Sequence, residues 1–256
     1  VTPTDITDLF STYLYKGNGD PNTSNTQTIT NGIDLDGKGG LVWIKKRTQA
    51  TAPGVAGHYL FDTERGSGDP WKYIRTDSTV AQDSDSNTVT SFNSNGFSIG
   101  YKWWINGNNE DIVSWTWRKA PKFFDCVTYS GDSTSGRMIS HNLGSVPGMI
   151  IVKRTNGTGT WYVYHRDLGN TKNLYLNGTS GQATDGAWDN QSPTSTQFGV
   201  SSGGPINGTG EDFVAYIFAH NDSGDGGFGP TYDQDIIKCG SLVSGTVQDI
   251  NLGWEP

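Results

Sequence analysis

The stretch Asn106–Trp117, which reads NGNNEDIVSWTW, decides the fold because the chain contains it twice. A second version, NGTGEDFVAYIF, spans Asn207–Phe218, 101 residues further along. In both versions a polar turn leads into a segment with large residues at every second position, which is the period of a half-buried β-strand. The stretch therefore predicts two β-domains of similar construction.

Other parts of the chain repeat in the same order with a slowly changing offset. Phe61–Gly66 recurs as Tyr164–Gly169 with an offset of 103, and Leu41–Lys45 recurs as Met149–Lys153 with an offset of 108. Small loop deletions in a duplicated domain produce such a drift. A period above about 100 residues indicates separate domains in tandem and not a solenoid, whose short repeats cannot fold alone.

These offsets predict three segments. We expect a first unit over residues 1–121, a second over 122–235, and either the start of a third repeat or a closing strand over 236–256. The last segment is separated because Asn142–Pro147 recurs as Asn251–Pro256, where the sequence stops. We therefore expect the chain to be a segment of something longer.

The composition favours an all-β chain and argues against several functional classes. Only 33% of residues are hydrophobic, but 9 Trp, 11 Tyr and 10 Phe supply large buried areas, and 35 Gly predict many tight turns. The net charge of −8 argues against nucleic acid or anionic membranes as partners, since both attract clustered Lys and Arg. No apolar run has the length of a transmembrane helix, so no membrane insertion is expected. Cys126 and Cys239 occupy equivalent repeat positions, which predicts buried thiols and not a disulfide.

The spacing of apolar runs predicts the architecture of each unit. Short strands at spacings of roughly 8–12 residues are typical of a two-sheet sandwich or jelly roll. The continuous apolar runs Leu41–Ile44 and Met149–Val152 predict central strands covered on both faces. One helical turn is expected in each unit, near Phe61–Gly66 and Tyr164–Gly169.

The most conspicuous carboxylates are the pairs Glu110–Asp111 and Glu211–Asp212. Paired carboxylates catalyse hydrolysis in glycosidases. However, adjacent strand residues point to opposite faces, so one pair cannot flank a single glycosidic bond unaided. Both pairs also lie at a turn-to-strand junction, which predicts a structural role. His165–Asp167 loses its histidine in the first unit and is expected to be a surface turn.

Two acidic loops are weak candidates for a metal site. Asp83–Asn87 resembles the first half of a calcium loop, but Thr88 and Ser94 replace the glycine and glutamate that such a loop requires. Asp222–Gly227 is a second loop rich in oxygen ligands. We expect no cofactor and interpret both as solvated loops. Ca²⁺ is the one ion for which they stay candidate sites.

Aromatic residues present in only one copy are the sharpest candidates for a binding site. Trp103 and Trp104 align with Gly204 and Pro205, so the repeated fold does not require indoles there. Two indoles at one loop can form a platform for the C–H face of a sugar. The alternative is that they cap the core or cover the neighbouring unit. The candidate glycan contacts are Trp103, Trp104, Tyr101, Trp71 and Trp188.

Four segments resemble a domain repeated in virion proteins of marine phages, particularly cyanophages. They are Leu41–Lys45, Thr90–Phe97, Trp115–Asp125 and Ile139–Ile150. The resemblance implies tandem, homologous β-sandwich domains of lectin-like architecture in tail fibres or other appendages. It supplies no catalytic residue to carry over.

Together these observations predict a structural protein of a bacteriophage virion, assembled in the host cytoplasm, and not an enzyme. We expect a tail fibre segment that attaches to a host-surface glycan and contacts other virion proteins, in a homo-oligomer that is a trimer by analogy. One alternative is a capsid decoration or horn- or knob-like appendage protein. Another is a polysaccharide-degrading tailspike, with two carboxylates from different strands about 5–10 Å apart.

Overall fold

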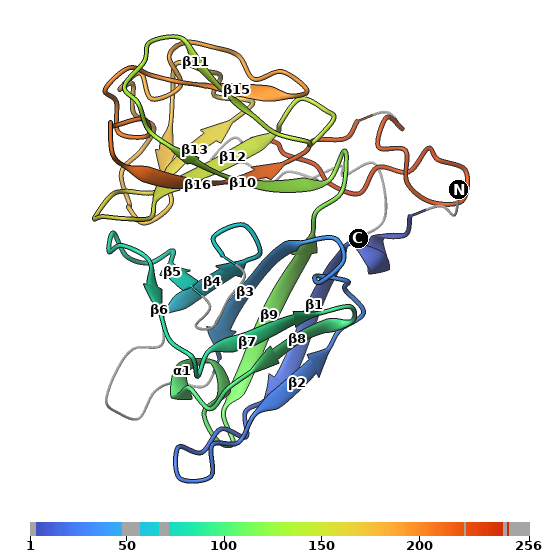
Figure 1. Cartoon of the computed structure of the whole chain (residues 1–256). Helices are drawn as coiled ribbons and strands as arrows, with labels where there is room; N and C mark the ends of the chain where they lie inside the picture. The colour runs from blue at the N-terminus through green and yellow to red at the C-terminus, as the bar shows by residue number, and fades with distance from the viewer. Residues whose placement is uncertain (1–3, 48–56, 67–71, 223, 243–244, 246–256) are drawn as a thin grey trace. The chain divides into compact units, whose positions relative to one another are not determined.

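The structure is a computed structural model that describes residues 4–47, 57–66, 72–222, 224–242 and 245 (Figure 1). The described chain is nearly all β, as expected. It contains one short 3-10 turn, η1 (Ile6–Asp8), and one four-residue helix, α1 (Trp103–Asn106). The chain divides into two compact units. The first consists of Thr7–Lys119 with Thr155–Thr160, and the second takes in most of the chain from Ala120 onward together with the N-terminal residues up to Ile6.

The first unit contains a six-stranded and a three-stranded antiparallel sheet. The larger sheet has the order β1-β9-β3-β4-β5-β6 and the smaller β2-β8-β7. The strands of the larger sheet are β1 (Phe10–Lys16), β9 (Asp111–Arg118), β3 (Gly40–Lys46), β4 (His58–Asp62), β5 (Lys72–Arg75) and β6 (Asp83–Ser84). Those of the smaller sheet are β2 (Gln27–Thr30), β8 (Gly96–Ile99) and β7 (Val89–Asn93).

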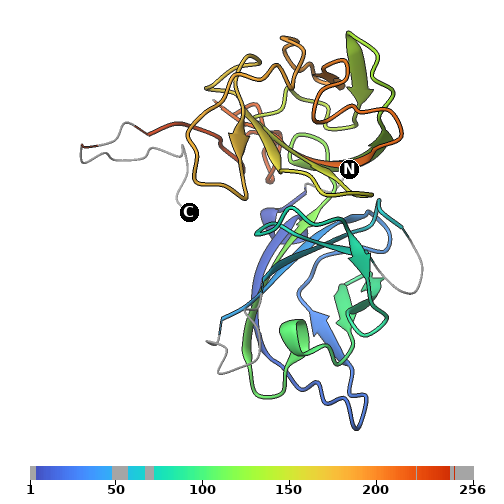
Figure 2. The ribbon, with the colours of Figure 1, turned by 90° about the vertical axis from the view of Figure 1, so that its left-hand side faces the viewer.

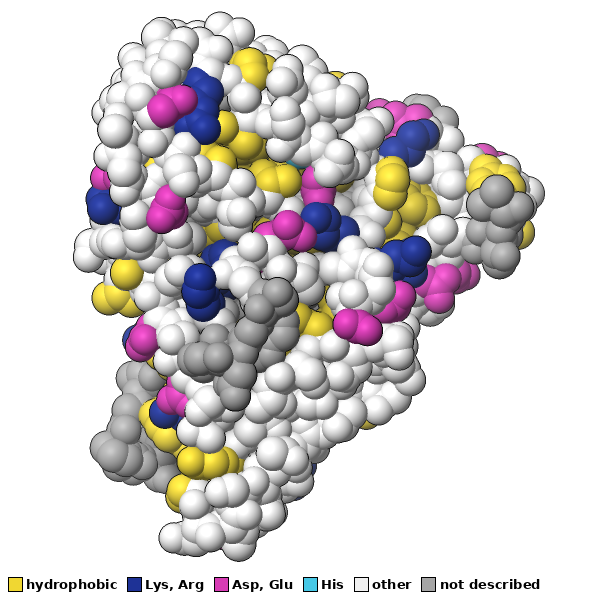
Figure 3. All heavy atoms as spheres, in the orientation of Figure 1, with side chains coloured by type: hydrophobic (Ala, Val, Ile, Leu, Met, Phe, Trp, Pro, Cys, Tyr) yellow, Lys and Arg dark blue, Asp and Glu magenta, His cyan; other side chains and the backbone are white. Residues whose placement is uncertain are grey.

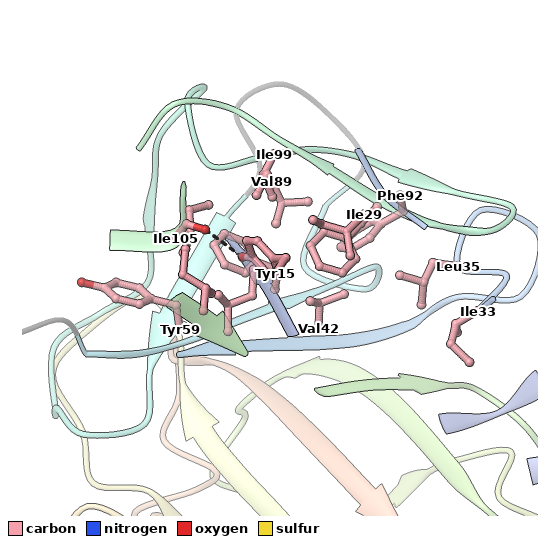
Figure 4. Close-up of a cluster of buried hydrophobic side chains, with 14 of the residues drawn as sticks. Tyr15, Ile29, Ile33, Leu35, Val42, Tyr59, Val89, Phe92, Ile99 and Ile105 are labelled. Carbon is pink, nitrogen blue, oxygen red and sulfur yellow. Dashed lines mark hydrogen bonds between the residues drawn. The ribbon is translucent and has the colours of Figure 1, made fainter. Parts of the chain in front are cut away.

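The two sheets of the first unit enclose one hydrophobic core, which makes it a β-sandwich (Figures 2 and 4). Alternate residues of β3, Val42 and Ile44, face the smaller sheet, which contributes Ile29 and Phe97. These side chains are almost completely buried. The aromatic-rich, short-stranded sequence thus forms a two-layer fold with large side chains between the layers.

The second unit contains a five-stranded and a two-stranded sheet. The larger has the order β10-β16-β12-β13-β14, and β11 pairs with β15. The strands are β10 (Phe124–Ser130), β16 (Asp212–Phe218), β12 (Met149–Arg154), β13 (Tyr162–His165), β14 (Leu174–Tyr175), β11 (Arg137–Ser140) and β15 (Gln197–Val200). Its own core includes Val152, Trp188 and Phe198.

Strand order matches position by position between the larger sheets, with β1-β9-β3-β4-β5 corresponding to β10-β16-β12-β13-β14. The match extends to one tyrosine hydrogen bond in each unit. The Tyr15 hydroxyl donates to the carbonyl of Ile105 over 2.7 Å, and the Tyr129 hydroxyl donates to that of Ile206 over 2.8 Å. Descent of both units from one duplicated domain stays a prediction, which this match supports.

The helical turn expected near Phe61–Gly66 is absent, and that prediction is wrong. Near Tyr164–Gly169 the chain does make a hydrogen-bonded turn, in which the carbonyl of His165 accepts the N–H groups of Leu168 and Gly169. The first segment is the end of β4 followed by a bend. There the Asp62 carboxylate accepts the backbone N–H groups of Glu64 and Arg65, as a helix-capping residue would. Gly66, at φ +143°, then turns the chain away from a helical path.

The segment after the second unit lies against that unit over its described residues. The carbonyl of Ile237 accepts the backbone N–H of Asn221, and the N–H of Cys239 donates to Nδ1 of His220. None of the described residues between Ile236 and Leu242 belongs to a strand, and the repeated Asn251–Pro256 lies outside the described residues. Within the described parts of the chain, no helix is long and apolar enough to span a membrane.

Candidate functional site

Of the predicted glycan contacts that the structure describes, Trp103 is the one with an exposed indole. Its exposed fraction is 43%. It begins α1, directly after the turn that follows β8. The other end of α1 is fixed by Asn106, whose side-chain amide donates to the carbonyl of Gly100 and whose Oδ1 accepts the N–H of Asn18. The buried asparagine therefore holds the short helix in place, and the helix presents Trp103.

The indole of Trp103 rests on a nearly buried ammonium group. Nζ of Lys46 lies 5.6 Å from the ring centroid, within the range of a cation–π contact. The Lys46 side chain is only 4% exposed and pairs with Oε1 of Glu110 over 2.6 Å. Lys46 therefore contacts the indole from a buried position, while part of the indole stays accessible to solvent.

The ion pair beneath Trp103 has an equivalent in the second unit, but the indole does not. Arg154, at the end of β12, pairs with Glu211 just before β16, as Lys46 at the end of β3 pairs with Glu110 just before β9. The aligned position for the indole is Gly204. The ion pair is therefore part of the common framework, and the exposed indole is an addition to one copy.

Sequence reasoning did not identify Lys46 as part of this site. A signal was available, since the period of two that places Val42 and Ile44 in the core also places Lys46 on the same face of β3. A lysine at a core-facing position requires a nearby carboxylate, and Glu110 was the conspicuous candidate.

Trp104 belongs to the core and not to the surface, so the two-indole platform is corrected to one indole. The Trp104 side chain is 5% exposed and stacks on Tyr59 with ring centroids 3.7 Å apart. It also lies parallel to Phe61 at 6.4 Å. An indole enclosed on its face by tyrosine offers no surface to a glycan.

Of the remaining aromatic candidates, Trp188 is also corrected to a core residue. It is 2% exposed and contacts Tyr164 edge-on, with ring centroids 5.8 Å apart. Tyr101 is half-buried in the turn before α1. Trp71 lies outside the described residues.

The repeated carboxylates are held as scaffold elements. Glu110 and Glu211 each bind a cation, as described above, and both precede the first residue of a strand. Asp111 pairs with Lys16 over 3.2 Å, and Asp212 accepts the hydroxyl of Ser130 over 2.7 Å. Nothing in this arrangement directs a carboxylic acid and a carboxylate at one glycosidic bond.

The loop Asp83–Asn87 uses its carboxylates within the protein. Asp83 accepts the hydroxyl of Tyr73 over 3.0 Å, and Asp85 forms an ion pair with Lys102. In the second acidic loop, Asp222–Gly227, the backbone N–H groups of Gly224 and Gly226 donate to the carboxylate of Asp235, which lies further along the chain. In the part of the chain that the structure describes, no three His, Cys, Asp or Glu side chains are grouped as metal ligands.

Comparison with known proteins gives one match. No curated protein and no solved structure was found to match the chain. A family model described as a domain of unknown function, DUF7483, matches residues 5–230, a range that includes every strand of both units. The chain therefore belongs to the DUF7483 family.

Proposed function

We propose that this chain is a carbohydrate-binding structural segment of a phage tail fibre, acting in attachment to the host surface and not in catalysis. The main support for this proposal is Trp103, whose exposed indole contacts Lys46 in the first unit. The second unit has the same framework but no indole at the aligned position. The phage and tail fibre part of the proposal is supported by the sequence resemblance given above.

The geometry supports glycan stacking in physical terms. A pyranose presents a face of C–H groups, which packs on the electron-rich face of an indole. The Lys46–Glu110 pair holds that indole in place before binding, so little conformational freedom is lost when a sugar stacks on it. One such contact is weak, and several copies in a fibre would multiply it through effective concentration.

The direct test is a binding measurement on the full chain with Trp103→Ala. We expect the variant to lose about tenfold or more in affinity for a glycan that the wild-type protein binds on a carbohydrate array, which is about 1.4 kcal/mol. Tyr232→Ala is the matched control, because it removes another exposed aromatic ring, from the second unit. Equal affinities of the wild-type protein and Trp103→Ala would refute the assignment of the site.

The homo-oligomer is a separate part of the proposal, with a trimer expected by analogy alone. Size-exclusion chromatography with light scattering measures it directly. A mass near three times 27.7 kDa supports it. A monomer across the accessible concentration range would remove the oligomer and leave the glycan site to be judged by the Trp103 variant.

A further inference from the structure

The charges around Trp103 limit which class of glycan it can accept. Lys46 contacts the ring, and Lys102 directly precedes Trp103 in the chain. Lys46 is held by Glu110, and Lys102 is held by Asp85. Both of these positive charges are therefore matched by a carboxylate of the protein.

Arg47 is the cation that directly follows Lys46, just beyond the end of β3. Arg47 continues the pairing of β3 with β9, since its backbone N–H donates to the carbonyl of Asp111 over 2.7 Å. Continued alternation of side chains would direct Arg47 to the face opposite Lys46. On that opposite face Asp111 pairs with Lys16.

The carboxylate of Asp85, which holds Lys102, is charged at neutral pH. Burial acts to raise the pKa of Asp85, but hydrogen bonds from Lys102 and from the Asn87 N–H outweigh it, and the pKa of Asp85 is lowered overall. A sugar acid entering the site would have to displace Asp85 or Glu110 from its cation, or lie beside a carboxylate without compensation. Such unpaired charge costs binding energy and excludes the wrong ligand.

On these grounds we infer that Trp103 selects a neutral hexopyranose and discriminates against uronic acids and sulfated sugars. This inference rests on the proposed function, because it assumes that Trp103 binds a glycan. Most of the face drawn in Figure 3 is uncharged, and acidic side chains are interspersed with basic ones. The chain as a whole carries a net charge of −8, which also disfavours an acidic polysaccharide.

The test compares neutral and acidic polysaccharides on the same protein. The full chain is titrated with dextran and galactomannan, and with alginate and carrageenan, using the wild-type protein, Trp103→Ala and the control Tyr232→Ala. We expect binding to a neutral polymer that Trp103→Ala weakens about tenfold or more and Tyr232→Ala leaves unchanged. The affinity for the neutral polymer should change less than about twofold as NaCl is raised from low salt to about 0.5 M, since no ion pair forms on binding.

A charge variant makes the inference more specific. Asp85→Asn leaves Lys102 without its carboxylate, so this variant should gain binding to alginate while its binding to the neutral polymer stays within about twofold of wild type. Trp103-dependent binding of alginate or carrageenan by the wild-type protein would overturn the neutral-sugar inference and leave the proposed glycan site standing. No binding to any of the polymers, neutral or acidic, would count against both the neutral-sugar inference and the proposed glycan site.

Discussion

Two adjacent tryptophans have opposite environments in this protein, which separates binding from stability at the level of single residues. Trp104 stacks on Tyr59 in the core, whereas the next indole back along the chain, Trp103, is 43% exposed. We expect Trp104→Ala to lower the free energy of unfolding by about 3–5 kcal/mol, because it leaves a cavity in the core. Trp103→Ala should change that free energy by less than about 1 kcal/mol.

Denaturation by urea, followed by circular dichroism, measures both values. Loss of stability in Trp103→Ala as large as that in Trp104→Ala would mean that Trp103 is part of the core, contrary to the site described here.

A second prediction at the residue scale concerns the thiol of Cys239. Burial raises the pKa of this thiol from 9.0 to about 11. The neutral thiol is therefore favoured in the folded protein. Its contribution to stability is fully present below pH 9.0 and is lost as the pH rises to about 11. Alkylation of Cys239 by iodoacetamide, followed by mass spectrometry, should accelerate through that window. Rapid alkylation at neutral pH would contradict the raised pKa of this half-buried thiol.

The core indoles show why part of the site could not be predicted from sequence. Aligning the repeats by a linear shift places Trp104 opposite Pro205 and gives Trp188 no partner, so both seemed dispensable for the fold. In the structure, Trp104 packs beside Phe61 and Trp188 beside Tyr164, two residues that hold equivalent register positions on β4 and β13. Each unit fills a comparable part of its core with an indole from a different part of the chain.

At the scale of elements, the alternation of large residues was sufficient to predict the strands. Val113–Trp117 lies within β9, and the continuous run Leu41–Ile44 lies within β3, between β9 and β4 in the larger sheet. Side chains alternate between the two faces of a strand, so local sequence carries this period. It does not tell which face meets the core, since Ser114 and Thr116 are the fully buried residues of the β9 run. Helix α1 could not be predicted, because its four residues are fixed by Asn106 and its distant partner Asn18.

The junctions between turns and strands are stabilised by ion pairs that differ in burial, which gives a matched comparison. Glu110→Ala leaves the ammonium of Lys46 buried without its carboxylate, and we expect a loss of about 2–3 kcal/mol in unfolding free energy. Asp111→Ala, one residue later, breaks a pair whose side chains are 62% and 55% exposed. That change should cost less than about 1 kcal/mol, because solvent screens the pair.

Chemical denaturation of both variants distinguishes the two cases. Equal losses would show that burial of Lys46 does not govern the energetics of this junction, and would weaken the argument that the pair forms a rigid support for Trp103.

At the scale of the whole molecule, each unit has its own core and its own pair of sheets. We therefore expect differential scanning calorimetry to resolve two unfolding transitions. Trp104→Ala should lower the midpoint of one transition, and Trp188→Ala should lower the other, since the two indoles belong to different cores. A single transition that both variants shift equally would show that the units do not unfold separately.

The account as a whole holds that an indole added to one unit of a repeated β-sandwich scaffold binds the glycan. The chain has nine tryptophans, so ¹⁵N-labelled protein should give nine indole N–H signals, and a Trp103→Phe spectrum identifies that of Trp103. On titration with oligosaccharides of a neutral polymer that the protein binds, the Trp103 signal should shift, while that of Trp43, hydrogen-bonded to His58, stays in place. Saturable glycan binding during which the Trp103 signal does not move would contradict the account.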